Sequence, residues 1–175
     1  MNVSRRHALR QLACVSIGAV LIPSCMEDKS KSSLLLKHLK VTASDEQMLA
    51  ELCEIILPKS GTPGAKDIGA HLFVLTMVDD CSNAEQQKSF IKGMEDFTAL
   101  CKKTTGKALV DCTTEERKKI TEAIVASGEH QPELLQFLDK VKRRTIQAYT
   151  TSEFFLTKIQ VYELVPGRYH GCVPV

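Results

Sequence analysis

The sequence predicts an all-α domain of five to six helices that follows an N-terminal export signal. Apolar residues recur at intervals of three and four after several capping-box sequences, as they do in amphipathic helices. Alternation of apolar and polar residues, the pattern of half-buried strands, persists nowhere in the chain. With 175 residues, of which 43% are hydrophobic, the chain is long enough for one domain with its own core.

Residues 1–24 are typical of an export signal rather than of a folded domain. Arg5, Arg6 and Arg10 form a basic region, and an apolar run at residues 12–22 follows it. That run is too short to span a bilayer comfortably. The arginine pair Arg5 and Arg6 lies in the sequence Ser-Arg-Arg-His-Ala-Leu-Arg, which resembles the twin-arginine export motif.

Residues 21–25, Leu-Ile-Pro-Ser-Cys, are similar to a lipoprotein cleavage box in which Cys25 carries the lipid. The alternatives are a signal that is simply cleaved and one that stays as an uncleaved anchor. Lipidation of Cys25 would hold the protein at a membrane, on the periplasmic side of the cell envelope. Residues 25–41 would then be a polar tether and residues 42–175 the helical domain.

Two expected helices flank a turn that is rich in glycine and proline. Residues 44–47 form a capping box, and the helix that they begin ends at Pro58. The turn occupies residues 59–66. The next helix runs from about Asp67 to Asp79. Because residues 68–78 are apolar on almost every face, we expect this helix to be buried at the centre of the domain.

Further helices are expected in the second half of the chain. Residues 82–85 form a second capping box, Gly106 is the matching stop signal, and the apolar stripe between them comprises Phe90, Ile91, Met94, Phe97 and Cys101. Residues 113–116 form a third capping box, with Gly128 as the stop. Pro132 suits the first turn of another helix. Residues 152–164 are either one more helix or a strand.

The thiols that would remain in the lipidated, exported chain are Cys53, Cys81, Cys101, Cys112 and Cys172. Export favours one or two structural disulfides, and buried free thiols are the alternative. A Cys101–Cys112 bond would join the end of one helix to the start of the next. No Cys-x-x-Cys sequence occurs, which argues against a redox thiol pair, a zinc knuckle or covalently attached haem.

Few other residues are candidates for chemistry. His71 lies in the expected buried helix, where a histidine bonded to a neighbour is commoner than a ligand. Asp79 and Asp80 are adjacent and do not face each other on a helix, so we expect no acid–base dyad. Nucleotide-binding and nucleophile-elbow motifs are absent. The net charge of +2 argues against nucleic-acid binding.

The C-terminal tail, residues 166–175, is too rich in glycine and proline to be helical, yet it carries apolar side chains. We therefore expect it to be held by something outside itself. Arg168 and Tyr169 are the expected anchors on a partner protein, because arginine and tyrosine often dominate interfaces. The alternative is that the tail packs on its own domain, with Cys172 in a disulfide.

Three stretches together resemble one known family. They are Ile55-Ile-Leu-Pro58, the segment Thr62-Pro-Gly-Ala-Lys66 with Gly69, His71 and Phe73 after it, and the closing Pro166-Gly-Arg-Tyr169 with Gly171-Cys172. Over roughly residues 42–175 the chain is similar to the gluconate 2-dehydrogenase subunit 3 family. The resemblance implies a small, non-catalytic subunit without a cofactor of its own.

The resemblance also implies partners. They are a large FAD-dependent dehydrogenase subunit of the glucose-methanol-choline type, which would hold the FAD and oxidise a sugar, sugar acid or related alcohol, and a cytochrome subunit that accepts the electrons. Twin-arginine export moves folded proteins. This chain, however, shows no cofactor site that would require it to fold before export. A folded, FAD-loaded partner without its own signal would explain the leader, and the chain would then assist its export and maturation.

Two other functions are kept open by the sequence. The chain could be a lipid-anchored binding or structural protein of the cell envelope without an enzyme partner. It could also be an independent enzyme or electron carrier that uses the tail from Tyr169 to Cys172. A bound flavoprotein would support the small-subunit hypothesis, and a coloured cofactor in the purified chain would support the electron carrier.

Overall fold

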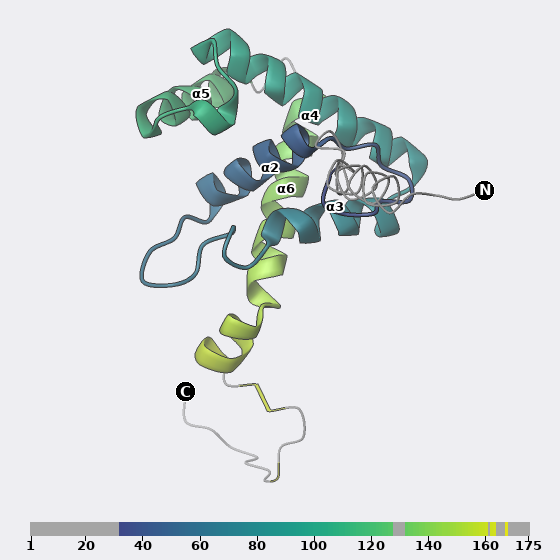
Figure 1. Ribbon diagram of the computed structural model, residues 1–175, viewed down its shortest axis with the longest axis vertical. Coiled ribbons are helices and arrows are strands. Elements are labelled where there is room, and N and C mark those ends of the chain that lie inside the picture. Colours follow the sequence, from purple (N-terminus) through teal and green to yellow (C-terminus); the bar gives the residue numbers. More distant parts are fainter. Residues whose placement is uncertain (1–31, 128–131, 161, 164–166, 168–175) are drawn as a thin grey trace, which may run out of the picture. The chain divides into compact units, whose positions relative to one another are not determined.

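The computed structural model describes residues 32–127, 132–160, 162, 163 and 167. Its elements, shown in Figure 1, are α2 (Ala43–Ile56), α3 (Ala70–Cys81), α4 (Ala84–Thr105), the 3₁₀ helix η1 (Leu109–Asp111), α5 (Thr114–Ser127), α6 (Pro132–Thr150) and the π-helix η2 (Phe155–Ile159). No strand occurs in the described ranges, so the prediction of an all-α fold is confirmed.

Helix α6 contacts four of the other elements. It packs most extensively against α4 and next against α3, and it also contacts α2 and η2. The α4–α6 contact is close because Gly93 of α4 faces Phe137 of α6: a Cβ atom on Gly93 would lie 2.4 Å from the Cβ of Phe137. Glycine is therefore required at this position by packing rather than by backbone conformation.

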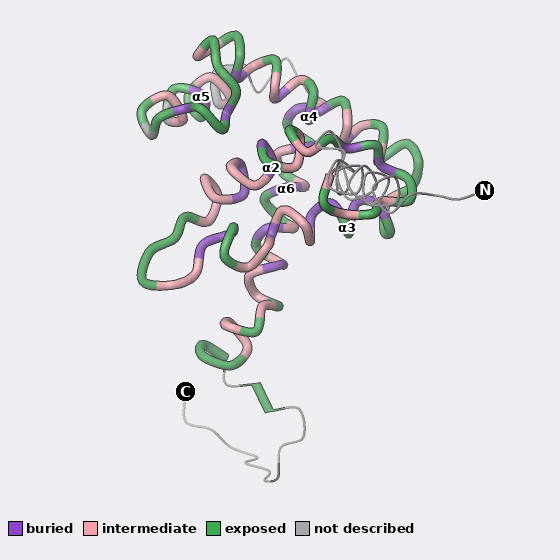
Figure 2. Tube along the Cα trace, in the orientation of Figure 1, coloured by how far each residue is buried: buried purple, intermediate pink, exposed green. Residues whose placement is uncertain are grey.

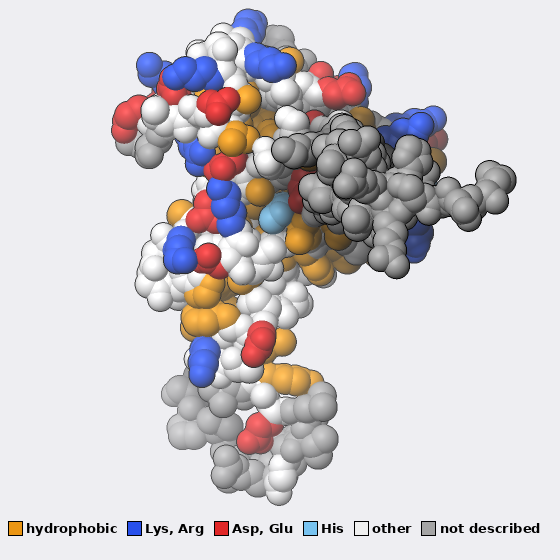
Figure 3. Space-filling view, viewed as in Figure 1, with side chains coloured by type: hydrophobic (Ala, Val, Ile, Leu, Met, Phe, Trp, Pro, Cys, Tyr) orange, Lys and Arg blue, Asp and Glu red, His pale blue; other side chains and the backbone are white. Residues whose placement is uncertain are grey.

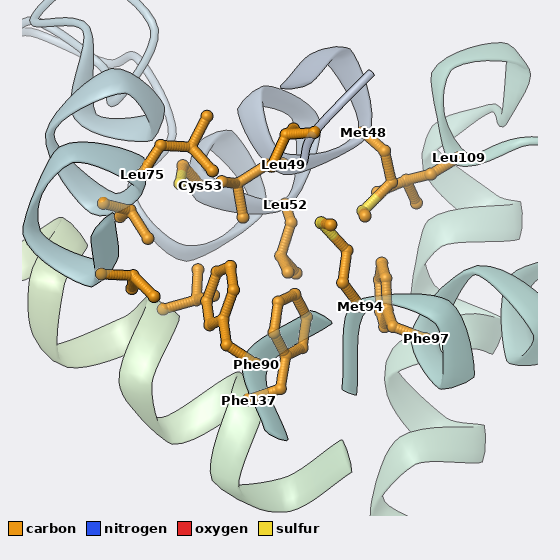
Figure 4. Packing of buried hydrophobic residues seen from close by; sticks show 14 of the residues in the cluster. Met48, Leu49, Leu52, Cys53, Leu75, Phe90, Met94, Phe97, Leu109 and Phe137 are labelled. Carbon is orange, nitrogen blue, oxygen red and sulfur yellow. The ribbon is translucent and has the colours of Figure 1, made fainter. Parts of the chain in front are cut away.

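The hydrophobic core lies between α2, α3, α4 and α6 (Figure 4). Phe137 is at its centre, with its ring centroid 5.0 Å from that of Phe90 and 6.1 Å from that of Phe97. Leu52 and Met94 point into the same space (Figure 4). The expected stripe of α4 is confirmed at Phe90, Met94, Phe97 and Cys101, all of which are buried, while Ile91 is only half-buried.

Helix α3 is not the central buried helix that its composition predicts. Only one of its faces is buried, at Ala70, Val74, Leu75, Val78 and Asp79. Leu72, Phe73 and Met77 are half-buried. The helix also starts later than expected, because Gly69 precedes it in a left-handed conformation with φ of 65°. An apolar composition therefore indicated burial but could not tell a surrounded helix from one that covers a core.

The helices begin at capping residues close to the expected ones, with shifts of one or two positions along the sequence. The cap of α2 is Thr42 paired with Asp45, rather than residues 44–47, and that of α4 is Asn83 paired with Gln86, rather than residues 82–85. Each correction moves the box by one or two residues, because neighbouring Ser, Thr, Asn and acidic side chains can all serve as caps. The expected box at residues 113–116 is formed: Glu116 accepts a hydrogen bond from the Thr113 amide at 2.7 Å.

Two of the expected helix ends in the second half of the chain are confirmed. Gly106 ends α4 with φ of 72°, and α6 begins at Pro132. Gly128 lies outside the described residues. Within residues 152–164, the described part forms the short π-helix η2 rather than a strand. The chain before α2 is also part of the folded body, because Leu39 and Val41 are buried at 6% and 9% exposure.

Candidate partner interface

The chain after α6 forms a fixed turn. The Ser152 hydroxyl donates to the Tyr149 carbonyl at 2.6 Å and accepts from the Phe155 amide at 3.2 Å, so it ends one helix and begins the next. The Gln160 amide then donates to the carbonyl of Phe155, five residues earlier, at 2.9 Å. This spacing makes η2 a π-helix, a geometry that is often found at functional sites.

Apolar side chains of this region lie outside the core. The ring of Tyr149 contacts those of Phe154 and Phe155, with centroids 6.4 Å and 5.7 Å away. No residue of η2 is buried. In this segment the most exposed apolar side chains are Ile146, Ile159 and Tyr162, at 48%, 53% and 56%. We call the apolar side chains of this segment the C-terminal apolar surface; they are Ile146, Tyr149, Phe154, Phe155, Leu156, Ile159 and Tyr162.

The C-terminal apolar surface is the clearest candidate for a contact with another protein. Figure 2 shows η2 in the colours of half-buried and exposed residues, and Figure 3 shows hydrophobic side chains at the surface near it. Exposed apolar groups that gather in one region mark interaction sites more often than single ones do. Tyrosine and phenylalanine are enriched at interfaces because they bury much area with few rotatable bonds.

The α2–α3 loop, residues 57–69, is rigidly attached to α2. Glu54 accepts hydrogen bonds from the amides of Lys59 and Lys66, both at 2.9 Å. The Ala65 amide donates to Leu57, and Ala65 itself is completely buried. A Cβ atom on Gly64 would lie 2.6 Å from the Glu54 carboxylate, so only glycine fits there. The Thr-Pro-Gly-Ala segment thus has a structural role in holding the loop.

Ion pairs connect the same loop to two helices. Glu51 of α2 pairs with Lys66 at 2.6 Å and with Arg117 of α5 at 3.0 Å, and its side chain is only 14% exposed. Lys59 pairs with Asp67 inside the loop at 3.1 Å. These contacts fix the loop and α5 against α2, and they leave Ser60 and Gly61 exposed at its tip.

His71 is half-buried in the first turn of α3. Its Nδ1 atom is buried and has no hydrogen-bond partner, so the expected bond to a neighbour is not formed at this nitrogen. Burial lowers the pKa of His71 and the nearby Lys66 lowers it further, while Glu46 acts in the opposite direction. The imidazole is therefore neutral at pH 7, with its buried Nδ1 atom unpaired.

Asp79 and Asp80 have separate partners and do not act as a pair. The buried Asp79 carboxylate accepts hydrogen bonds from the amides of Lys37, His38 and Leu39 at 2.7, 2.8 and 2.8 Å. Burial alone would raise the pKa of Asp79, but these three bonds hold it below its usual value. Asp80 is exposed and pairs with Lys37 at 3.0 Å. Asp79 is thus the anchor of the segment before α2.

The predicted Cys101–Cys112 disulfide is not formed. Cys53, Cys81, Cys101 and Cys112 are all free thiols. The Cys112 thiol instead donates to the Ala108 carbonyl at 3.2 Å, while Cys101 is buried within α4. Burial raises the pKa of Cys53 to about 11 and that of Cys101 to about 12, so neither is a nucleophilic thiolate near neutral pH.

Two shallow grooves lie elsewhere on the surface of the described residues. One, of about 220 Å³, lies between the start of α4 and α6 and includes Ser89 and Lys140. The other, of about 390 Å³, lies between residues 38–40 and α4. Within the described residues, no three His, Cys, Asp or Glu side chains are grouped as metal ligands would be. None of the helices described is both long and apolar enough to cross a membrane.

The remaining predicted site residues lie outside the described residues. They are Arg5 and Arg6 of the export signal, the lipidation candidate Cys25, and the tail residues Arg168, Tyr169 and Cys172. The C-terminal apolar surface was not predicted from the sequence as a site. Its signal was present in Phe154, Phe155 and Ile159, but the i, i+4 spacing of Phe155 and Ile159 equally suits the core face of a helix, so the sequence could not mark them as exposed.

Comparison with known proteins gives one match. A family model described as gluconate 2-dehydrogenase subunit 3 matches residues 43–167, which is well over half of the chain. The matched region begins with the first residue of α2 and includes every described helix together with the C-terminal apolar surface. No curated protein and no solved structure matches the chain.

Proposed function

The chain belongs to the gluconate 2-dehydrogenase subunit 3 family, and from this premise we propose that it is the non-catalytic small subunit of a membrane-associated dehydrogenase complex. Its partner in this proposal is a large FAD-dependent subunit of the glucose-methanol-choline type, which oxidises a sugar or sugar acid. The electrons pass from that subunit to a cytochrome. The observation that carries the proposal is the family match, which spans the helical body.

The chemistry of the complex is assigned to the partner because the described residues of this chain do not suit it. A flavin dinucleotide is usually held at a Gly-rich turn between a strand and a helix, and the described ranges contain no strand. The buried thiols are not thiolates, the Nδ1 atom of His71 has no hydrogen-bond partner, and the Asp79 carboxylate is bonded to backbone amides. In this proposal the large subunit holds the FAD, and this chain supplies binding surface.

The large subunit docks on the C-terminal apolar surface and on the tail that follows it, with Arg168 and Tyr169 as further anchors. The support is physical: η2 is held by backbone hydrogen bonds yet buries none of its residues in its own domain. A partner that covers these side chains would gain about 25 cal/mol for each Å² of apolar surface removed from water. Half-buried aromatic groups on a fixed turn need little ordering when they bind.

Export and anchoring complete the proposal. Arg5 and Arg6 direct the folded chain and its flavoprotein through the twin-arginine route, and Cys25 carries the lipid that holds the complex at the periplasmic side of a membrane. This chain thereby assists the export and maturation of a partner that has no signal of its own.

Affinity purification of a C-terminally tagged chain from detergent-solubilised membranes tests the subunit assignment. We expect one large protein to co-purify together with the absorbance spectrum of bound flavin. In cells that carry Arg5→Lys and Arg6→Lys, we expect both proteins to stay in the cytoplasm. A chain that purifies alone and colourless from its native membrane would contradict the proposal and would favour an envelope protein without an enzyme partner.

A further inference from the structure

Both charged and apolar side chains line the groove between residues 38–40 and α4. Leu39, which is buried, and Ile91, which is half-buried, form its apolar part. Lys40 and Lys88 are exposed at the groove, one from the segment before α2 and one from α4. With a volume of about 390 Å³, the groove is in the size range of sites that accept several side chains or a small ligand.

The positive charge of this groove is not balanced within the described residues. Lys92, which also lines it, pairs with Glu133 at 3.0 Å and is thus neutralised. No described acidic residue forms an ion pair with Lys40 or Lys88, and Glu95 is the one carboxylate among the lining residues. Two unpaired lysines thus flank an apolar floor.

The groove is also held in shape by contacts that do not involve its lysines. The Asp79 carboxylate binds the amides of residues 37–39 and so fixes one wall. The Gln87 side chain donates to the carbonyls of Asp79 and Ser82 at 2.9 and 3.1 Å, which fixes α4 against the end of α3. A ligand would therefore meet a preformed site and would need to order only the lysine side chains.

From this arrangement we infer that the groove is a second docking site for the large subunit, and that it binds an acidic segment which also carries an apolar side chain. The inference rests on the small-subunit function proposed above and adds a surface to it. The acidic groups would lie against Lys40 and Lys88, and the apolar group would cover the half-buried Ile91. Charge pairs of this kind contribute mainly to the rate and specificity of association, which depend on salt.

Zero-length carbodiimide cross-linking of the purified complex tests the inference, because it joins a lysine only to a carboxylate in direct contact. We expect Lys40 and Lys88 to be joined to Asp or Glu of the large subunit. Lys40→Glu with Lys88→Glu should weaken the complex at least about tenfold, which corresponds to about 1.4 kcal/mol. Its control, Lys102→Glu with Lys103→Glu, changes the charge equally at the exposed far end of α4 and should bind as the wild type does.

The possible results distinguish a failure of the groove inference from a failure of the small-subunit assignment. If the wild-type chain retains the flavoprotein but the Lys40/Lys88 variant retains it equally well, the groove inference is wrong and the small-subunit function stands. Cross-links from Lys40 and Lys88 to acidic residues of this chain alone would overturn the inference in the same way. If the wild-type chain retains no flavoprotein, both proposals fail.

Discussion

At the scale of single residues, the most informative side chain is Asp79. A buried carboxylate is costly unless it is hydrogen-bonded, and here three consecutive amides supply the bonds. Adjacency to Asp80 suggested a charged pair at a helix end, and the sequence correctly argued against a catalytic dyad. The attachment of residues 37–39 could not be foreseen, because the bonds join positions about forty residues apart through backbone groups that have no sequence signature.

We expect Asp79→Asn to lower the free energy of unfolding by roughly 2 kcal/mol. An amide oxygen in place of Oδ1 still accepts the bonds from His38 and Leu39, but the bond from Lys37 is lost, and a charge-assisted hydrogen bond contributes about 1.5–3 kcal/mol. Urea denaturation followed by circular dichroism measures the change. Asp80→Asn is the matched control. It removes only an exposed ion pair with Lys37, so its effect should stay below about 1 kcal/mol.

The difference in stability between the wild type and Asp79→Asn should also depend on pH. The pKa of Asp79 is lowered in the folded state, so its stabilisation is fully present above the unfolded value of about 3.9 and is lost as the pH falls through the folded value. The stability gap between wild type and Asp79→Asn should therefore be constant from pH 7 to 5 and should narrow below about pH 4. A gap that stays the same down to pH 2.5, the pH to which the denaturation series extends, would contradict this role.

The thiols provide a second prediction at this scale. Because burial raises the pKa of Cys53 and Cys101, both should resist alkylation in the native protein at pH 8, whereas the exposed Cys81 should react first. Peptide mapping by mass spectrometry after iodoacetamide treatment distinguishes them. In unfolded protein without reductant, Cys101 and Cys112 should both be alkylated. Their protection under those conditions would show a disulfide that the structure does not have.

At the scale of elements, the sequence predicted the existence and type of the helices better than their mutual arrangement. Capping residues and Gly106 placed the helix boundaries within a few residues. Helix α6, and not the more apolar α3, makes the most extensive contacts with the other helices. A narrow apolar stripe can contact several neighbours, and periodicity does not say how many. The close approach of α4 and α6 at Gly93 could likewise not be predicted from the sequence, because it depends on Phe137 of another helix.

We expect Gly93→Ala to destabilise the fold by about 1–3 kcal/mol. The added methyl would lie 2.4 Å from the Phe137 Cβ and 2.8 Å from the Glu133 carbonyl oxygen, so the two helices would have to move apart. This cost exceeds the gain of about 1 kcal/mol in helix propensity. Gly61→Ala is the control, because a Cβ there meets nothing within 4 Å. An unchanged melting temperature for Gly93→Ala would show that α4 and α6 are less tightly packed.

At the scale of the whole molecule, the described chain has a rigid helical body and apolar groups that its own core does not use. Substitution of those groups should separate binding from folding. In Ile159→Asp with Tyr162→Ser, the free energy of unfolding should change by less than about 0.5 kcal/mol, since both side chains are more than half exposed. Retention of the flavoprotein in a pull-down should fall at least about tenfold, which corresponds to 1.4 kcal/mol.

The control for that pair is Val110→Asp with Leu135→Asp. These side chains are also exposed and apolar, at 40% and 41%, but they lie outside the C-terminal apolar surface. The control should therefore retain the flavoprotein as the wild type does. Equal loss of binding in both double variants would show that general surface hydrophobicity, and not the end of α6 with η2, determines the contact.

The central claim is that this chain is the small subunit of a flavin-dependent dehydrogenase. Native mass spectrometry of the wild-type chain, released from its membrane in mild detergent, tests it most directly. We expect one species whose mass equals this chain plus a single larger protein, and on activation the larger protein should lose the mass of one FAD while this chain loses none. A spectrum that contains the chain alone, or bound only to proteins without flavin, would contradict it.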